Sequence, residues 1–173
     1  SCYAGFLSEL IFAADRSYMA EGEFEEYDDK EASIILSSSN FGNFLMSNDM
    51  PRLDTRFIGS PEQILLAKQN LEKHILAQEA HDLGLITFKF DDIDWDDEIR
   101  VFLEERSSFS PDSMVGMESN LRFPGKETME TKIFGRLSAW QNWIFQRPSA
   151  VGENGALKKY GTGNKGQYTK ERT

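Results

Sequence analysis

Residues 126–146 carry the longest helical pattern in the chain, and they decide what its second half can fold into. Apolar side chains recur there at helical spacing, with Trp140 and Trp143 three residues apart on one face. Because indole rings bury large apolar areas, this face needs a cover, either inside the molecule or on another chain. Pro148 is expected to end the helix, since proline lacks an N–H group and clashes with the preceding turn. These features predict a mainly helical region at residues 107–151.

The first part of the chain mixes helical and extended patterns. Residues 6–14 are apolar at almost every position, which predicts a helix that is buried nearly all round. Residues 21–31 are rich in carboxylates and predict an exposed acidic loop. Residues 33–37 predict a short strand. A helix is expected at residues 60–76, because Ser60 and the proline after it are typical of a helix start.

The signals after this helix are mostly helix boundaries. Gly84 predicts a helix end, followed by a strand at residues 85–88. Three acidic residues open a helix expected at residues 96–106, where negative charge suits the helix N-terminus. Ser110 and the proline after it predict another helix start. Residues 152–173 are rich in glycine and lysine and are expected to form an extended tail.

Charge and composition exclude several classes of protein. The chain has 173 residues and a formal net charge of −10, which argues against a general nucleic-acid binder. It has no apolar run long enough to span a membrane. Cys2 is its single cysteine, so a disulfide framework is excluded and a reducing, cytoplasmic location is expected. Residues 126–173 hold nine basic and four acidic side chains; they are either a solvated end or a surface for an anionic ligand.

Glu9 is the first candidate for a chemical role. It follows a glycine-containing turn and lies at the start of a helix that is otherwise apolar. A carboxylate in that place is a candidate general acid or base. The backbone N–H groups around Gly5 and Phe6 are candidates for an oxyanion hole, because first-turn amides have no partner within the helix. The structural alternative is that Glu9 pairs with an arginine or completes the helix start.

The sequence does not support a metal site. An EF-hand loop counted from Asp92 needs glycine at its sixth position and glutamate at its twelfth, but Asp97 and Leu103 stand there. Capping of the following helix is the better interpretation of these acids. His74 and His81 are seven residues apart, whereas paired zinc ligands on a helix usually stand three or four apart. No metal is expected.

Two segments resemble the crotonase (enoyl-CoA hydratase) superfamily. They read Gly5-x-x-x-Glu9-Leu10-x-x-Ala13-Ala14-Asp15-x-x-Tyr18 and Ala77-x-x-Ala80-x-x-x-Gly84-Leu85-Ile86. The first is similar to the glycine-rich oxyanion turn of that superfamily and the helix after it. The second is similar to a segment that comes later in these proteins. The resemblance implies an α/β fold: part of a ββα spiral at residues 1–106, followed by the helical region and the tail.

The second half resembles one family within the superfamily, the benzoyl-CoA-dihydrodiol lyases. The similar segments are residues 91–98, 127–137, 140–148 and 150–158. The resemblance is to the C-terminal third of these enzymes, so the chain is expected to begin inside the second of two crotonase-like modules. It implies a carbon-carbon lyase that opens 2,3-epoxybenzoyl-CoA hydrolytically to 3,4-dehydroadipyl-CoA semialdehyde and formate. The substrate is then a coenzyme A thioester, no cofactor is expected, and the implied partners are the upstream module and further copies in a homo-oligomer.

The same resemblance implies that this module is catalytically degraded. Glu9 matches the first catalytic glutamate of the superfamily, but the second position falls on Ser38, which cannot shuttle protons at neutral pH. Phe6 and Leu7 stand where crotonases have glycines. We therefore expect Glu9 and the Gly5–Phe6 amides to be vestigial and the isolated chain to be inactive. Two alternatives remain: a non-catalytic assembly module, and a free-standing hydratase-like enzyme that uses Glu9.

Overall fold

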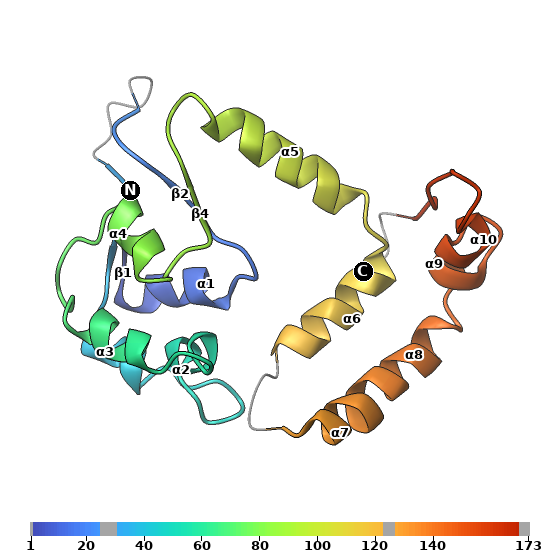
Figure 1. Cartoon of the computed structure of the whole chain (residues 1–173), viewed down its shortest axis with the longest axis horizontal. Helices are drawn as coiled ribbons and strands as arrows, with labels where there is room; N and C mark the ends of the chain where they lie inside the picture. The colour runs from blue at the N-terminus through green and yellow to red at the C-terminus, as the bar shows by residue number, and fades with distance from the viewer. Residues whose placement is uncertain (1, 25–30, 123–126, 170–173) are drawn as a thin grey trace. The chain divides into compact units, whose positions relative to one another are not determined.

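A computed structural model describes residues 2–24, 31–122 and 127–169 of the chain. The chain divides into two compact units, Ser1–Phe102 and Leu103–Thr173. The first unit combines strands with short helices, and the second is helical (Figure 1). Most of the predicted acidic loop, residues 25–30, lies outside the described residues.

The strands of the first unit form two parallel pairs. β1 (Cys2–Ala4) pairs with β3 (Ser33–Ile35), and β2 (Tyr18–Ala20) pairs with β4 (Phe88–Phe90). In register, Tyr3 lies opposite Ile34, and Met19 lies opposite Lys89. Parallel neighbours need a crossover connection, and the chain between β1 and β3 supplies it with α1 (Ser8–Ala13) and β2. The predicted strand at residues 33–37 is confirmed in a shorter form.

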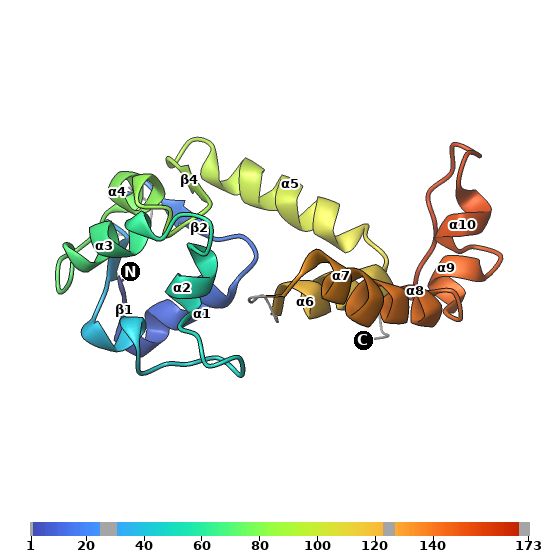
Figure 2. The ribbon, with the colours of Figure 1, turned by 60° about the horizontal axis from the view of Figure 1, so that its bottom comes forward.

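Helices connect and flank these strands in the first unit. They are η1 (Gly5–Leu7), α1, η2 (Ser38–Phe41), α2 (Arg52–Arg56), α3 (Glu62–Lys68), α4 (Ala77–Asp82) and α5 (Trp95–Ser107), whose last turns belong to the second unit. Phe12, Ile34, Leu53, Ile75 and Leu85 lie in one cluster of buried apolar side chains. α1 and α2 lie side by side, as Figures 1 and 2 show, and each contributes to this cluster.

Aromatic side chains join β2, β4 and α5. Phe88 and Phe90 are two residues apart in β4, so they lie on the same face of the strand. Tyr18 of β2 stacks on Phe88 with ring centroids 5.2 Å apart, and it contacts Phe102 of α5 at 4.9 Å. These ring contacts fix the α5 turn that carries Phe102 against the second strand pair.

The prediction for residues 60–76 is wrong in its second half. α3 ends at Lys68, and Glu72 takes a positive φ of 59° that no helix contains. The backbone instead pairs with β3 and its extension: the Ile75 N–H donates to Ile34 O, and the Glu72 N–H donates to Leu36 O, both at 2.9 Å. Tertiary backbone pairing has overridden a helical apolar pattern here.

Two further expectations are corrected by the first unit. Residues 6–14 are not buried all round: Phe6 is 66% and Leu10 is 59% exposed, and the buried members of α1 are Ser8, Glu9 and Phe12. Gly84 ends α4 in a left-handed conformation with φ of 72°, as predicted, but the following strand begins at Phe88 rather than at residue 85. The predicted helix at residues 96–106 is confirmed as α5.

The second unit is built from helices. They are α6 (Pro111–Arg122), α7 (Met129–Thr131), the π-helical segment η3 (Lys132–Leu137), α8 (Ser138–Ile144), α9 (Pro148–Val151) and α10 (Ala156–Lys159). The predicted long helix is thus confirmed from Met129 to Ile144, with a π-helical segment inside it. Pro148 begins α9 instead of ending that helix, and α10 interrupts the tail that was expected to be extended.

The tryptophan face of α8 packs partly against α6. A Cβ atom on Gly116 of α6 would overlap the indole nitrogen of Trp140, so only glycine permits this approach. α6 and α8 run beside each other in both ribbon views (Figures 1 and 2). Arg136 of η3 also reaches α6, donating from Nη1 to the carbonyl of Asn120 at 3.4 Å.

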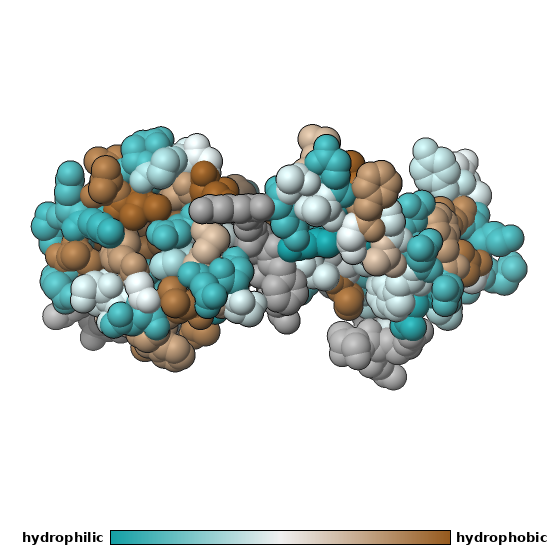
Figure 3. All heavy atoms as spheres, turned by 90° about the horizontal axis from the view of Figure 1, so that it is seen from below, coloured by the Kyte–Doolittle hydropathy of each residue, from teal (hydrophilic) through white to brown (hydrophobic). Residues whose placement is uncertain are grey.

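The second unit buries little apolar surface. Among its described residues, Ala150 is the one apolar side chain in the buried class, whereas Phe134 is 74% exposed. Figure 3 shows hydrophobic side chains at the surface of both units. No helix among the described residues is both long and apolar enough to cross a membrane.

Candidate functional site

Glu9 lies in the first turn of α1 and is almost completely buried. Its Oε1 accepts a hydrogen bond from Asn40 Nδ2 at 2.6 Å, and its Oε2 pairs with Arg52 Nη1 at 3.1 Å. Arg52 is the first residue of α2, which packs beside α1. A buried carboxylate is costly unless it is paired and hydrogen-bonded, and here both of its oxygens have a donor.

Asn40 of η2 organises the surroundings of Glu9. Its Nδ2 also lies 3.0 Å from Gly5 O and 3.2 Å from Ser8 Oγ. Its Oδ1 accepts from the backbone N–H and the hydroxyl of Ser37, at 2.9 and 3.2 Å. The side chain is 1% exposed, so these protein groups supply its partners. The same contacts with Ser37 cap η2.

Gly5 makes the turn that brings Glu9 to this network. Its φ is 52°, a left-handed conformation that glycine adopts without strain. Its carbonyl accepts from Ser8 Oγ at 2.7 Å and from Asn40. The described peptide bonds are trans, so the N–H of the Gly5–Phe6 peptide points opposite to that carbonyl, away from Asn40. Asn40 Nδ2 thus connects the Glu9 carboxylate to the carbonyl oxygen of this peptide and not to its N–H group.

The structural alternative for Glu9, a pair with an arginine, is confirmed, but the sequence did not indicate which arginine it is, and Asn40 was not predicted. Ser38, the position expected for a second acid, is exposed on η2, and it is Asn40 two residues later that contacts Glu9. The sequence carried one signal for Asn40, a serine three residues before it that allows a capping box. Arg52 had no local signal, because its partner lies 43 residues away. A role for Glu9 in proton transfer stays a prediction.

The histidines and the acidic run lie apart from this site. His74 lies between α3 and α4, where its Nδ1 is 2.9 Å from Ser33 Oγ, and His81 is an exposed residue of α4. Asp91 Oδ1 accepts the N–H groups of Ile93 and Asp94 at 3.2 and 3.1 Å, just before α5. Across the described ranges, no three His, Cys, Asp or Glu side chains gather in a way that would hold a metal ion.

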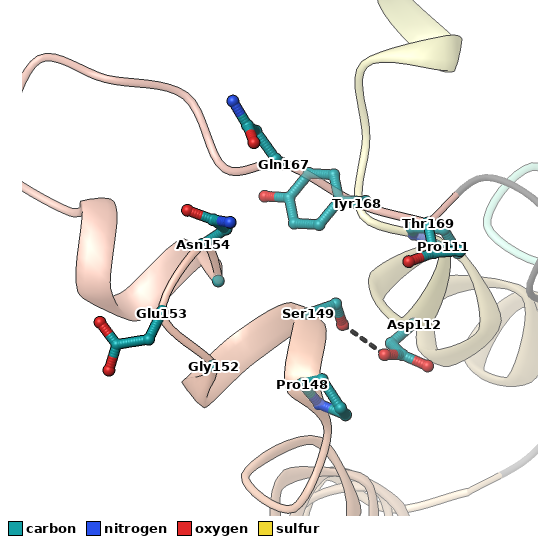
Figure 4. A pocket seen from close by; sticks show the side chains of 11 residues that line it. Pro111, Asp112, Pro148, Ser149, Gly152, Glu153, Asn154, Gln167, Tyr168 and Thr169 are labelled. Carbon is teal, nitrogen blue, oxygen red and sulfur yellow. Dashed lines mark hydrogen bonds between the residues drawn. The ribbon is translucent and has the colours of Figure 1, made fainter.

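The second unit contains a polar pocket of about 270 Å³ (Figure 4). Asp112, near the start of α6, is one of its lining residues and is largely buried. Its Oδ1 accepts from Arg147 Nε at 3.0 Å, and its Oδ2 accepts from the hydroxyl of Ser149. Figure 4 shows the Tyr168 ring and the Asn154 side chain lining the opposite side. Asp112 therefore ties α6 to the start of α9.

The wall of this pocket is a tight turn that needs glycine twice. A Cβ on Gly152 would lie 2.6 Å from Pro148 O, and a Cβ on Gly155 would lie 2.7 Å from Ala150 O. The backbone N–H of Gln167 donates to Asn154 O at 2.9 Å and attaches the following segment to the turn. The glycines that led us to expect an extended tail are thus required, at these two positions, by close backbone packing.

Comparisons with known proteins agree with the resemblance in the sequence. No protein-family model matches the chain. It is 49% identical over 168 residues to the benzoyl-CoA-dihydrodiol lyase of Aromatoleum evansii, a match that covers 97% of this chain and 29% of that protein. The chain therefore spans less than a third of the length of this curated relative.

Solved structures show the same fold. An enoyl-CoA hydratase/isomerase from Mycobacterium paratuberculosis has a TM-score of 0.62 at 14% identity, over 98% of this chain and 58% of that one. The enoyl-CoA hydratase EchA1 from Mycobacterium marinum has a TM-score of 0.62 at 13% identity, over 98% and 63%. The expected partial α/β crotonase-like fold is confirmed. The chain has the fold of the enoyl-CoA hydratase/isomerase proteins. Its sequence is related to one part of a benzoyl-CoA-dihydrodiol lyase.

Proposed function

We propose that this chain supplies part of a cytoplasmic ring-cleaving lyase that acts on a benzoyl-CoA derivative. The observation that carries the proposal is the 49% identity along nearly the whole chain to a benzoyl-CoA-dihydrodiol lyase. The reaction implied by the resemblance is hydrolytic opening of 2,3-epoxybenzoyl-CoA to 3,4-dehydroadipyl-CoA semialdehyde and formate. The coenzyme A thioester is then the substrate, and the rest of the lyase is the partner of this chain.

Within such an enzyme, we assign the chain a supporting role and not the acid–base chemistry. Both oxygens of Glu9 are held, by Asn40 and Arg52, and Ser38 offers no second carboxylate. A general acid or base must reach the proton that it transfers. The geometry therefore favours Glu9 as a group that fixes α1 against η2 and α2, with the catalytic carboxylates on the remaining part of the lyase.

A chimera tests this proposal. The matching segment of the Aromatoleum evansii lyase is replaced by this chain, and turnover of 2,3-epoxybenzoyl-CoA is measured. We expect the chimera to retain turnover, the lyase without the segment to lose it, and this chain alone to show none. Glu9→Gln in the chimera should leave kcat unchanged per folded molecule. An inactive but folded chimera, or ring opening by this chain alone, would contradict the proposal.

A second candidate function is assembly, because the second unit leaves so much apolar surface uncovered. Ile133 and Leu137 stand four residues apart on η3 and are both exposed. Large contiguous patches of exposed apolar surface mark protein–protein contacts, and these two side chains are candidates for the centre of such a patch. Light scattering of the chain should show a homo-oligomer that Leu137→Ser weakens. A monomeric wild-type chain at micromolar concentration would rule this function out.

A further inference from the structure

The first unit contains a cavity of about 430 Å³ that the Glu9 site does not use. Residues of β1, α1, β2 and β3 line it, together with Ile86 and with Trp95 at the start of α5. Glu9, Asn40 and Arg52 are not among its lining residues. Its volume falls in the range of small-molecule sites, roughly 300–1,000 Å³.

The lining of this cavity is apolar with one charge. Tyr3, Tyr18 and Trp95 are among its lining residues, and aliphatic residues such as Ile11 supply much of the rest. Among the described residues that line it, Arg16 is the one with a charge. An apolar body with a single negative charge complements such a lining, because the body displaces water from apolar surface and the charge pairs with the guanidinium.

Several lining residues are held by contacts with residues that do not line the cavity, Phe102 and Thr87. The Arg16 guanidinium lies 5.8 Å from the ring centroid of Phe102, and Tyr18 packs on the same ring. The Ser17 N–H donates to Thr87 Oγ1, and the Thr87 N–H donates to Ser17 Oγ, both at 3.1 Å. A site whose walls are already ordered loses less conformational entropy when a ligand binds.

We propose that this cavity binds a small carboxylate with an apolar body, with the carboxylate on Arg16 and the body among Tyr3, Tyr18 and Trp95. An apolar cavity of about 150 Å³ is enough for a benzene ring, so both aryl and short alkyl carboxylates fit the available volume. The proposal rests on the cavity and its single charge and is independent of the lyase function proposed above.

The indole N–H resonances of the three tryptophans report this binding in the whole chain. Trp95 lines the cavity, whereas Trp140 and Trp143 belong to the second unit. Titration with benzoate and with hexanoate should shift the Trp95 resonance saturably and leave the other two in place. The stronger of the two ligands identifies the body as aryl or alkyl. Benzamide, which has the ring without the charge, should bind about tenfold more weakly than benzoate.

Three variants locate the ligand. Arg16→Gln should weaken benzoate binding about tenfold and leave benzamide binding unchanged. Ala20→Leu, at a lining position, should abolish binding, whereas Ala13→Leu places the same side chain on an exposed position of α1 outside the cavity and should not. The fold of each variant is checked by circular dichroism. A Trp95 resonance that does not move at millimolar benzoate or hexanoate, or equal binding by Ala20→Leu and wild type, would overturn the proposal.

Discussion

The two units of this chain hold themselves together in different ways. The first has a continuous cluster of buried apolar side chains and, beside it, a buried polar network around Asn40. The second has Ala150 as its buried apolar side chain among the described residues, and it relies on close contacts such as Gly116 with Trp140 and Asp112 with Arg147. A buried polar network is costly to break because its groups have lost their water, whereas the second unit depends on a few separate contacts, so the units should respond differently to mutation.

Asn40→Asp should have the largest effect on stability, because it removes the central hydrogen-bond donor of the polar network in the first unit. The change replaces a buried donor by an oxygen that faces Gly5 O and the Glu9 carboxylate. We expect a loss of about 3 kcal/mol or more in the free energy of unfolding, measured by urea denaturation. Asn43→Asp, at an exposed position of the same loop, is the matched control and should change it little. Equal midpoints for the two variants would show that the network does not stabilise the first unit.

Gly116→Ala tests the contact on which the helices of the second unit depend. The added Cβ would overlap the Trp140 indole, so α6 and α8 must move apart. We expect the free energy of unfolding to fall by up to about 3 kcal/mol. The near-ultraviolet circular dichroism signal of the tryptophans should weaken, because it reports how their rings are packed. Gly135→Ala, where the Cβ meets no atom within 4 Å, should keep the signal and favour the helix slightly. A normal spectrum for Gly116→Ala would mean that the two helices are not held in this contact.

Two ion pairs of nearly the same length differ in how deeply their carboxylates are buried, and this difference separates the two units further. Asp112 with Arg147 and Asp97 with Arg100 join at 3.0 and 3.1 Å, but the Asp112 side chain is 11% exposed and that of Asp97 is 82% exposed. Asp112→Ala should therefore cost about 1–2 kcal/mol, because it leaves the Arg147 and Ser149 donors without their acceptor.

Asp97→Ala is the control for that change and should cost at most about 1 kcal/mol, since surface pairs contribute little. Hydrogen exchange of residues 148–155 should rise only in Asp112→Ala, because Asp112 holds the start of α9. Unchanged exchange there would remove Asp112 from the contacts that order the second unit.

The elements that sequence predicted well are those with local signals. α5 begins where Asp96, Asp97 and Glu98 gather, and α6 begins after Ser110, whose hydroxyl accepts the N–H of Ser113 at 3.4 Å. These signals depend on neighbouring residues and on the charge of the helix N-terminus, so no knowledge of the fold is required.

Elements set by distant partners were predicted less well. The apolar spacing of residues 60–76 matches a helix. Ile75 instead forms backbone hydrogen bonds with Ile34, 41 residues earlier. At the candidate site, Gly5 and Glu9 stood out as a turn and a helix start, whereas Asn40 and Arg52 join Glu9 across 31 and 43 residues. Single-sequence patterns contain no information on which distant donor will pair with a buried carboxylate.

The smallest expected effect lies at an exposed helix start in the second unit, and it tests whether α7 depends on local contacts. The pKa of Glu130 is held below its ordinary value, first by its own backbone N–H and second by the Thr128 hydroxyl. A carboxyl whose pKa is lowered by folding stabilises the folded state above its unfolded pKa, and this contribution disappears as the pH falls through the folded pKa.

Acidification below the ordinary range of a glutamate should therefore reduce helicity slightly in the wild-type chain, measured by far-ultraviolet circular dichroism. Glu130→Gln should lack this part of the acid response, and Glu118→Gln, at an exposed position of α6, is the control variant that should keep it. Identical acid profiles for Glu130→Gln and wild type would mean that α7 is ordered by its packing against the rest of the second unit and not by its own first turn.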